Sequence, residues 1–189
     1  MTSRLLKSRI LTVPNQLTFL RLAFLPFFII GIHYERYFWA LIILIAAGLT
    51  DALDGWLARG LNQKTPLGAY LDPIADKLLM TTSYLELALH SKIRWWLTIL
   101  VLGRDVLILV AAAVILITVG YRPFPPTLYG KVTTFLEILL IFLVLLLAVW
   151  SNHALWMVRE VCGYLVAAFV ILSGFHYAII VARRLHAGE

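Results

Sequence analysis

The sequence predicts an all-α membrane protein with six transmembrane helices and a short amphipathic helix at its N-terminus that lies on the membrane surface. Two observations predict this class. The chain has 189 residues, of which 62% are hydrophobic and 14% are charged, whereas a soluble domain is about half apolar and a quarter charged. Val106–Gly120 and Ile138–Asn152 are uncharged and almost entirely apolar, and about 20 such residues cross a bilayer.

Each element follows from an apolar run that ends at a polar or proline-rich break. Met1–Val13 places Arg4, Lys7 and Arg9 among apolar residues, which is typical of a helix on the membrane surface. Further spans follow the first apolar segment, and no small-residue cleavage site ends it, which argues against a cleaved signal peptide. The six predicted spans cover about residues 17–34, 38–59, 67–90, 95–120, 127–150 and 155–185. We expect residues 1–189 to form a single membrane domain.

Basic residues are distributed unequally between the two predicted sides of the membrane. One side would carry Arg4, Lys7, Arg9, Arg59, Lys64, Arg122, Lys131, Arg183 and Arg184, and the other would carry Arg36, Lys92, Arg94 and Arg159. An excess of Lys and Arg marks the cytoplasmic side, so both termini are predicted to be cytoplasmic. Tryptophans at the opposite span ends would form an interfacial belt: Trp39, Trp95, Trp96, Trp150 and Trp156.

The net charge of +6 has an explanation other than nucleic-acid binding. In a membrane protein, basic residues set topology and contact the anionic leaflet surface. The single cysteine, Cys162, lies in an apolar run and indicates neither a disulfide nor a metal cluster. We therefore expect a lipid bilayer, and no nucleic acid, as the partner of these charges.

Four aspartates gather in one short part of this otherwise apolar chain. Asp51 and Asp54 lie at i and i+3 near the end of the second span, and Asp72 and Asp76 lie at i and i+4 near the start of the third. Each spacing places a pair on one helix face. A short polar loop joins the two spans, so we expect them to be antiparallel neighbours whose acidic faces meet.

Clustered carboxylates at membrane depth repel one another and are usually partnered and functional. Hard oxygen ligands suit Mg²⁺ or Mn²⁺, and no Cys or His cluster is apparent that would favour zinc. The alternatives are a cation transporter, a proton pathway or paired charges near the interface. A transporter needs acidic residues spread through the depth of the membrane, whereas these gather at one end.

Small residues and a cation accompany the aspartates. Gly55 removes a side chain beside Asp54, Ala58 is small, and Gly68 lies one turn before the third aspartate. Arg59 carries a forked donor that matches phosphate geometry. Small residues also allow helices to pack closely, which is the structural alternative for the glycines and the alanine.

The pattern D-x2-D-G-x2-A-R-x8-G-x3-D-x3-D resembles the signature of the CDP-alcohol phosphatidyltransferase family. It is filled by Asp51, Asp54, Gly55, Ala58, Arg59, Gly68, Asp72 and Asp76 without a departure. The resemblance, which extends to the six-span layout, implies a transferase of phospholipid biosynthesis. Such an enzyme moves a phosphatidyl group from CDP-diacylglycerol to an alcohol and releases CMP.

The resemblance also implies roles for individual residues. Asp51, Asp54 and Asp72 would hold two Mg²⁺ or Mn²⁺ ions, with Asp76 near them, and Asp76 would be the base that deprotonates the acceptor alcohol. The CDP donor would contact Asn15, Thr18, Gly55, Ala58, Arg59, Thr65 and Gly68. For Asn15 and Thr18, which flank the predicted start of the first span, helix capping is the alternative.

Acceptor contacts are predicted at Arg21, Arg104, Lys131 and Thr134. Cations at such positions suit an anionic acceptor such as glycerol 3-phosphate. The alternatives are snorkelling to the interface for Arg21, an ion pair with Asp105 for Arg104, and a topology anchor for Lys131.

The stretches PNQLTFLR, LGAYLDPIADKLL and GKVTT resemble phosphatidylglycerophosphate synthases, which favours glycerol 3-phosphate as acceptor. Two departures, Asp105 in place of Glu and Thr133 in place of a second Lys, favour a cardiolipin synthase that uses phosphatidylglycerol. Inositol phosphate, serine and choline are further alternatives. By resemblance, we also expect a homodimer. The sequence shows no organelle-targeting extension, so we expect a bacterial cytoplasmic (inner) membrane, and the distribution of basic residues places the active site on the cytoplasmic side.

Overall fold

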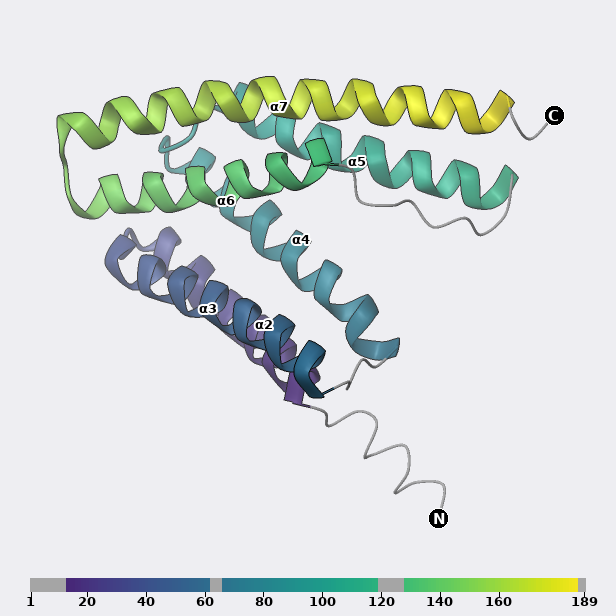
Figure 1. The fold of residues 1–189 in the computed structure, drawn as a ribbon. Helices are drawn as coiled ribbons and strands as arrows, with labels where there is room; N and C mark the ends of the chain where they lie inside the picture. The colour runs from purple at the N-terminus through teal and green to yellow at the C-terminus, as the bar shows by residue number, and fades with distance from the viewer. Residues whose placement is uncertain (1–12, 62–65, 119–127, 187–189) are drawn as a thin grey trace, which may run out of the picture. The chain divides into compact units, whose positions relative to one another are not determined.

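The computed structural model describes residues 13–61, 66–118 and 128–186. Within these ranges, the description excludes the side chains of residues 13–17, 51–61, 66–73 and 183–186 and those of Ala112, Ile115, Leu116 and Thr118. The described helices are α2 (Val13–His33), α3 (Tyr37–Leu61), α4 (Pro66–Leu89), α5 (Trp95–Thr118), α6 (Leu128–Val149) and α7 (His153–His186) (Figure 1). One helix matches each predicted span, which confirms the all-helical class, and the described residues contain no strand.

The start of α2 differs from the prediction. The surface helix was expected over Met1–Val13 and the first span from about residue 17, but Val13 already belongs to α2 and Pro14 lies in its first turn. A proline is tolerated there because the first N–H groups of a helix have no intrahelical acceptor. Residues 1–12 lie outside the described residues, so the surface helix remains a prediction.

The chain divides into two compact units, residues 1–90 and 91–189. In the first unit, α2 packs against both α3 and α4. The turn from α2 to α3 is tight: the Arg36 N–H donates to the Gly31 carbonyl at 2.7 Å, and Glu35 has a φ of 55°. A Cβ placed on Gly31 would lie 3.4 Å from the Ala40 Cβ, so a small residue is needed where the two helices meet.

In the second unit, α7 packs against α5 and α6. Fully buried aliphatic side chains form this core, among them Val101, Ile141, Leu145 and Val166. Near the start of α5, Arg94 donates to Glu160 at 3.0 Å and to the Tyr164 hydroxyl at 3.3 Å. The hydrogen bond that Arg94 donates to Tyr164, followed by the charge of Glu160, raises the pKa of Arg94.

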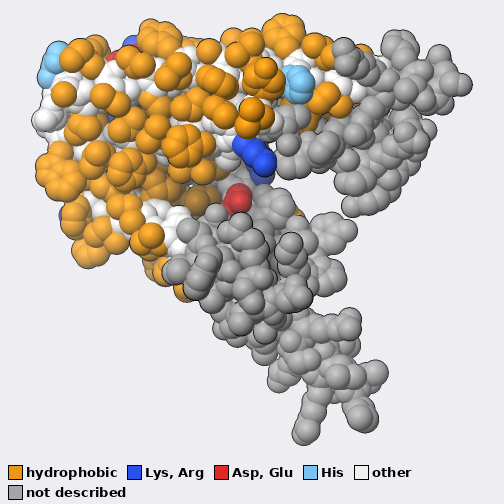
Figure 2. All heavy atoms as spheres, in the orientation of Figure 1, with side chains coloured by type: hydrophobic (Ala, Val, Ile, Leu, Met, Phe, Trp, Pro, Cys, Tyr) orange, Lys and Arg blue, Asp and Glu red, His pale blue; other side chains and the backbone are white. Residues whose placement is uncertain are grey.

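Polar and apolar side chains are distributed in the way a bilayer requires. Buried polar side chains include Arg104, Asp105, Glu137 and Ser173, whereas Ile117 is 84% exposed. Figure 2 shows apolar side chains over most of the described surface that faces the viewer. The five tryptophans of the predicted belt, Trp39, Trp95, Trp96, Trp150 and Trp156, are all exposed. A surface of this kind suits hydrocarbon rather than water.

Two segments of the described chain are long and apolar enough to cross a membrane, Leu128–Val149 and His153–Ala182. Thr18–His33 and Tyr37–Thr50 are shorter apolar helical segments. Some hydroxyl groups bond within their own helix: Thr50 donates to the Ala46 carbonyl at 2.5 Å and Ser83 to the Leu79 carbonyl at 2.5 Å. Such bonds allow polar side chains to remain in apolar surroundings.

Candidate functional site

The aspartate signature lies on α3 and α4, at the ends of these helices that the segment 62–65 joins. Asp51 and Asp54 belong to α3, and Asp72 and Asp76 belong to α4. Because these segments are helical, each pair occupies one helix face, as the spacing predicts. The side chains of Asp51, Asp54 and Asp72 lie outside the described residues, so the meeting of the two acidic faces remains a prediction.

The other residues of this region that were predicted to contact the CDP donor also lack a described side chain. Gly55, Ala58 and Arg59 lie in α3 and Gly68 in α4, but their side chains are outside the described residues, and Thr65 is outside them altogether. No contact of these residues with a nucleotide is therefore described.

Asp76 is the described member of the signature, and it contacts Arg21. The Arg21 Nη1 atom of α2 lies 2.5 Å from the Asp76 Oδ1 atom of α4. Arg21 is buried, with 3% of its side chain exposed, whereas 55% of the Asp76 side chain is exposed. An adjacent guanidinium stabilises a carboxylate as the anion. The packing of α2 on α4 thus brings an expected acceptor contact against the expected base.

Thr18 lies in the second turn of α2 and is 1% exposed. Helix capping is therefore not the role of Thr18, because α2 begins five residues earlier, at Val13. Asn15 lies in the first turn of α2, and its side chain is outside the described residues. Thr18 lies one turn before Arg21 on α2, a separation that places the two on neighbouring positions of one face.

Arg104, a candidate acceptor contact in α5, forms a buried polar network within the second unit. Its Nη1 atom donates to Asp105 Oδ1 at 2.9 Å, and its Nη2 and Nε atoms donate to the Ser173 hydroxyl at 2.8 and 3.2 Å. Its guanidinium carbon also lies 5.8 Å from the centre of the Tyr177 ring. The ion pair with Asp105, the structural alternative for Arg104, is present.

The two other acceptor candidates lie near the start of α6. Lys131 is exposed, and the Thr134 hydroxyl donates to the Gly130 carbonyl at 3.1 Å. Thr133 occupies the position at which the resembling synthases often carry a second lysine. It is fully buried, and its hydroxyl contacts the carbonyl of Tyr129 at 2.7 Å and that of Phe169 at 3.2 Å. Thr133 thus joins α6 to α7.

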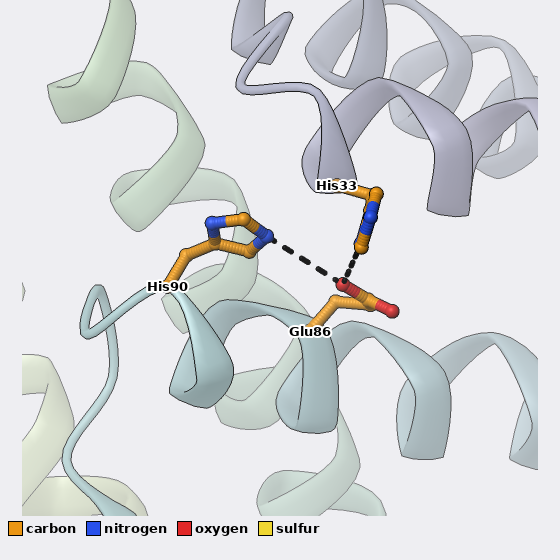
Figure 3. A group of neighbouring side chains, drawn as sticks. All are labelled: His33, Glu86 and His90. Carbon is orange, nitrogen blue, oxygen red and sulfur yellow. Dashed lines mark ion pairs between the residues drawn. The ribbon is translucent and has the colours of Figure 1, made fainter.

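Sequence reasoning missed a second polar cluster, because no histidine cluster was apparent along the chain. His33, Glu86 and His90 meet in the first unit, with their nearest ligand atoms all within 4.8 Å of one another (Figure 3). The available signal was the i,i+4 spacing of Glu86 and His90 at the end of the third span, together with His33 at the end of the first.

The donor set of the signature fits a hard divalent cation. Four carboxylates from two helices supply oxygen ligands only, which suits Mg²⁺ or Mn²⁺ better than a metal that prefers nitrogen or sulfur. The exposed half of the Asp76 side chain leaves this carboxylate accessible to a ligand. The residues of the signature are therefore compatible with the predicted ions.

Comparison with known proteins agrees with the family that the aspartate signature resembles. A family model described as CDP-alcohol phosphatidyltransferase matches residues 11–172. A protein of Mycobacterium tuberculosis (strain H37Rv) named "Putative cardiolipin synthase" is 39% identical over 132 residues, which cover 69% of this chain and 63% of that protein. The cardiolipin synthase (CMP-forming) of Streptomyces coelicolor is 37% identical over 139 residues, 70% of this chain and 64% of that protein.

A third relative aligns over almost its full length. The CDP-diacylglycerol–glycerol-3-phosphate 3-phosphatidyltransferase of Aquifex aeolicus is 32% identical over 171 residues, which cover 89% of this chain and 95% of that protein. By contrast, the matched part of this chain spans less than two thirds of the length of the mycobacterial and streptomycete relatives.

Proposed function

Because the chain belongs to the CDP-alcohol phosphatidyltransferase family, we propose that it transfers a phosphatidyl group from CDP-diacylglycerol to an alcohol in phospholipid biosynthesis. The observation that carries the proposal is the complete eight-position signature, distributed over α3 and α4. In the reaction, the acceptor oxygen bonds to the phosphorus that carries diacylglycerol, the pyrophosphate bridge breaks, and CMP leaves.

Asp51, Asp54, Asp72 and Asp76 would hold Mg²⁺ or Mn²⁺, in our proposal two ions. When bound, divalent cations neutralise charge on pyrophosphate and on the departing phosphate. Arg59 and the clearance at Gly55, Ala58 and Gly68 would hold the CDP moiety, together with Asn15, Thr18 and Thr65. Positioning and charge neutralisation of this kind account for most phosphoryl-transfer catalysis.

Asp76 would accept the proton of the acceptor hydroxyl. A general base must lie within hydrogen-bond reach of that proton and must be ionised. The contact with Arg21 supports this role, because a buried guanidinium at 2.5 Å both fixes the carboxylate and stabilises its charge. We therefore assign Arg21 as a positioning residue for Asp76, in addition to its expected place near the acceptor.

The six helices would all span the membrane, with residues 1–189 acting as one membrane domain. The apolar exposed surface and the exposed tryptophans support the spans, and the family match across both units supports a single functional domain. We further propose that the protein is a homodimer of the inner membrane, with both termini and the active site facing the cytoplasm.

Glycerol 3-phosphate is the acceptor that we propose. The Aquifex relative, which aligns along 95% of its length, is named for this acceptor, and Lys131 is an exposed cation near the start of α6. Arg104 and Thr134 would complete the acceptor contacts, with the Arg104 side chain oriented by Asp105 and Ser173.

Phosphatidylglycerol is the second candidate, and different observations favour it. The relatives at 39% and 37% identity are named as cardiolipin synthases. Thr133 is buried between two carbonyls where a second cation would serve a phosphomonoester, and the charge of Arg104 is paired with Asp105. A lipid acceptor that carries only a phosphodiester needs fewer cations.

Purified full-length protein should be assayed for CMP release with CDP-diacylglycerol, Mg²⁺ or Mn²⁺, and each acceptor separately. The proposal predicts release with glycerol 3-phosphate and not with phosphatidylglycerol. The reverse result would replace the proposed acceptor with the second candidate. Lys131→Gln tests the acceptor site, since it should raise the KM for glycerol 3-phosphate and leave the KM for CDP-diacylglycerol unchanged.

A further inference from the structure

His33, Glu86 and His90 form a cluster at the ends of α2 and α4 that lie away from Arg21 and Asp76. His33 is the last residue of α2, Glu86 lies in the last turn of α4, and His90 directly follows α4. Ten residues separate Asp76 from Glu86 along α4, a distance of about 15 Å at the helical rise. The cluster is thus separate from the aspartate signature.

Both imidazoles of the cluster approach the same carboxylate oxygen. The His33 Nδ1 and His90 Nε2 atoms lie 3.7 and 3.8 Å from Glu86 Oε2 (Figure 3). Two ligands that bind zinc at about 2.0–2.1 Å with tetrahedral angles are about 3.4 Å apart. These two separations exceed that value by a few tenths of an ångström, and the three ligand atoms all lie within 4.8 Å of one another, so side-chain rotations would be needed to bring them to zinc-binding distances.

The Glu86 oxygen at the centre of the cluster has no hydrogen-bond donor among the described residues. Glu86 Oε2 is buried, and both nearby nitrogens lie beyond hydrogen-bond distance. A buried carboxylate oxygen without a donor is costly. A bound cation would satisfy it directly.

The surrounding backbone also favours positive charge. The C-terminal ends of α2 and α4 meet at the cluster, and a helix C-terminus carries partial negative charge. Glu86 adds a full negative charge in the last turn of α4, where the helix dipole disfavours it. A divalent cation would offset both contributions.

A second carboxylate lies behind one of the imidazoles. Glu35 Oε1 lies 3.9 Å from His90 Nδ1, on the side of the ring opposite the nitrogen that faces Glu86. Histidine ligands commonly direct their second nitrogen toward a carboxylate, which fixes the tautomer and the ring orientation. Glu35 is held in this turn with a φ of 55°.

We propose that His33, Glu86 and His90 bind a transition-metal dication of the zinc class, with Glu35 orienting His90. Two nitrogens and one oxygen suit Zn²⁺ better than Mg²⁺ or Mn²⁺, and a water would complete the tetrahedron. The ion joins the end of α2 to the end of α4. Because the ion joins these two helix ends, its loss should loosen the first unit.

Zinc binding by full-length protein without a histidine tag, stripped of metal and held in detergent at about pH 7.5, tests the proposal, since neutral imidazole is the binding form. Calorimetry should detect a zinc site in the wild-type protein, and Zn²⁺ should raise its melting temperature. His33→Gln, His90→Gln and Glu86→Gln should each weaken binding by more than about 100-fold, and Glu35→Gln by about 10-fold.

His153→Gln and Asp51→Asn are the controls, because they alter a histidine and a carboxylate outside the cluster. With Mg²⁺ in large excess, so that the proposed ion site of the signature is occupied, both should bind zinc at the cluster as the wild type does. The site does not exist if wild-type protein shows no binding, or if His33→Gln and His90→Gln bind as tightly as wild type. Loss of binding in Asp51→Asn alone would place the zinc at the signature instead. His33 is 62% exposed, so its replacement should leave the fold intact, and the melting temperature without metal verifies this.

Discussion

The Arg21 Nη1 atom lies 2.5 Å from the Asp76 Oδ1 atom, and the two side chains differ sharply in exposure. Arg21 is 3% exposed and Asp76 is 55% exposed. The Arg21 guanidinium is thus fixed between α2 and α4, while about half of the Asp76 side chain remains accessible. This arrangement suits a general base, because the contact with Arg21 holds the Asp76 carboxylate in place and its exposed part can reach a substrate.

Asp76→Asn should reduce turnover by roughly 10²–10⁴-fold, because the acceptor hydroxyl would lose its base. Affinity for the CDP donor should be retained, since the other three signature aspartates remain. Steady-state CMP release and nucleotide binding by calorimetry measure the two quantities. Turnover equal to that of the wild type would exclude Asp76 as the base.

Arg21→Gln should also lower turnover, by about 10²-fold if the carboxylate loses its orientation. Arg21→Lys keeps the charge but not the forked geometry, so it should restore part of the rate. The double variant Arg21→Gln/Asp76→Asn should melt at a higher temperature than Asp76→Asn, because removing the counter-charge of a buried arginine is costly. If the double variant melts at a lower temperature than Asp76→Asn, the buried charge of Arg21 does not need Asp76 as its counter-charge.

Asp51→Asn should abolish the metal-dependent part of nucleotide binding, since it removes a carboxylate from the proposed ion site. In the wild-type protein, a chelator should have the same effect, and added Mg²⁺ or Mn²⁺ should reverse it. Calorimetric titration with CDP, with and without metal, separates these contributions. Unaltered metal-dependent binding in Asp51→Asn would remove this residue from the ligand set.

Ser173→Ala should destabilise the protein by about 1–3 kcal/mol, because its hydroxyl accepts two hydrogen bonds from a buried, charged guanidinium. Ser83→Ala is the matched control: Ser83 is equally buried, but its hydroxyl donates only to its own helix, at the Leu79 carbonyl. Unfolding in mixed micelles compares the two. Equal losses of stability in the two variants would mean that the hydrogen bonds from Arg104 to Ser173 add no stability.

Ser91→Gly should stabilise the protein by about 0.5–1 kcal/mol, because Ser91 has a φ of 55°, a left-handed conformation that costs least for glycine. Ser151→Gly lacks this gain, since Ser151 is not among the described residues with positive φ, and it should be neutral or destabilising. A lower melting temperature for Ser91→Gly than for wild type would contradict the backbone assignment.

The helices were predictable because apolar runs and polar breaks alternate along the chain, and each predicted span has its helix. The start of α2 was placed too late, since Pro14 suggests a break but is tolerated in a first turn. The local sequence cannot distinguish a helix that begins after Pro14 from one that contains Pro14 in its first turn, because in both cases the proline precedes an apolar run.

Contacts between distant residues were less accessible from the sequence. The Arg104–Asp105 pair could be anticipated because the residues are adjacent, whereas Ser173 joins it across 69 positions. Arg21 could be expected to face a site, but its distance to Asp76 depends on how α2 packs on α4. The cluster of His33, Glu86 and His90 was missed for the same reason, since its members come from two helix ends.

CMP release from CDP-diacylglycerol, measured side by side for wild-type protein and Asp76→Asn in the presence of Mg²⁺ or Mn²⁺, tests the proposed phosphatidyl transfer most directly. The proposal predicts acceptor-dependent CMP release by the wild type that ceases with chelator and is nearly absent in Asp76→Asn. No release with any alcohol acceptor, or equal release by the two proteins, would contradict it.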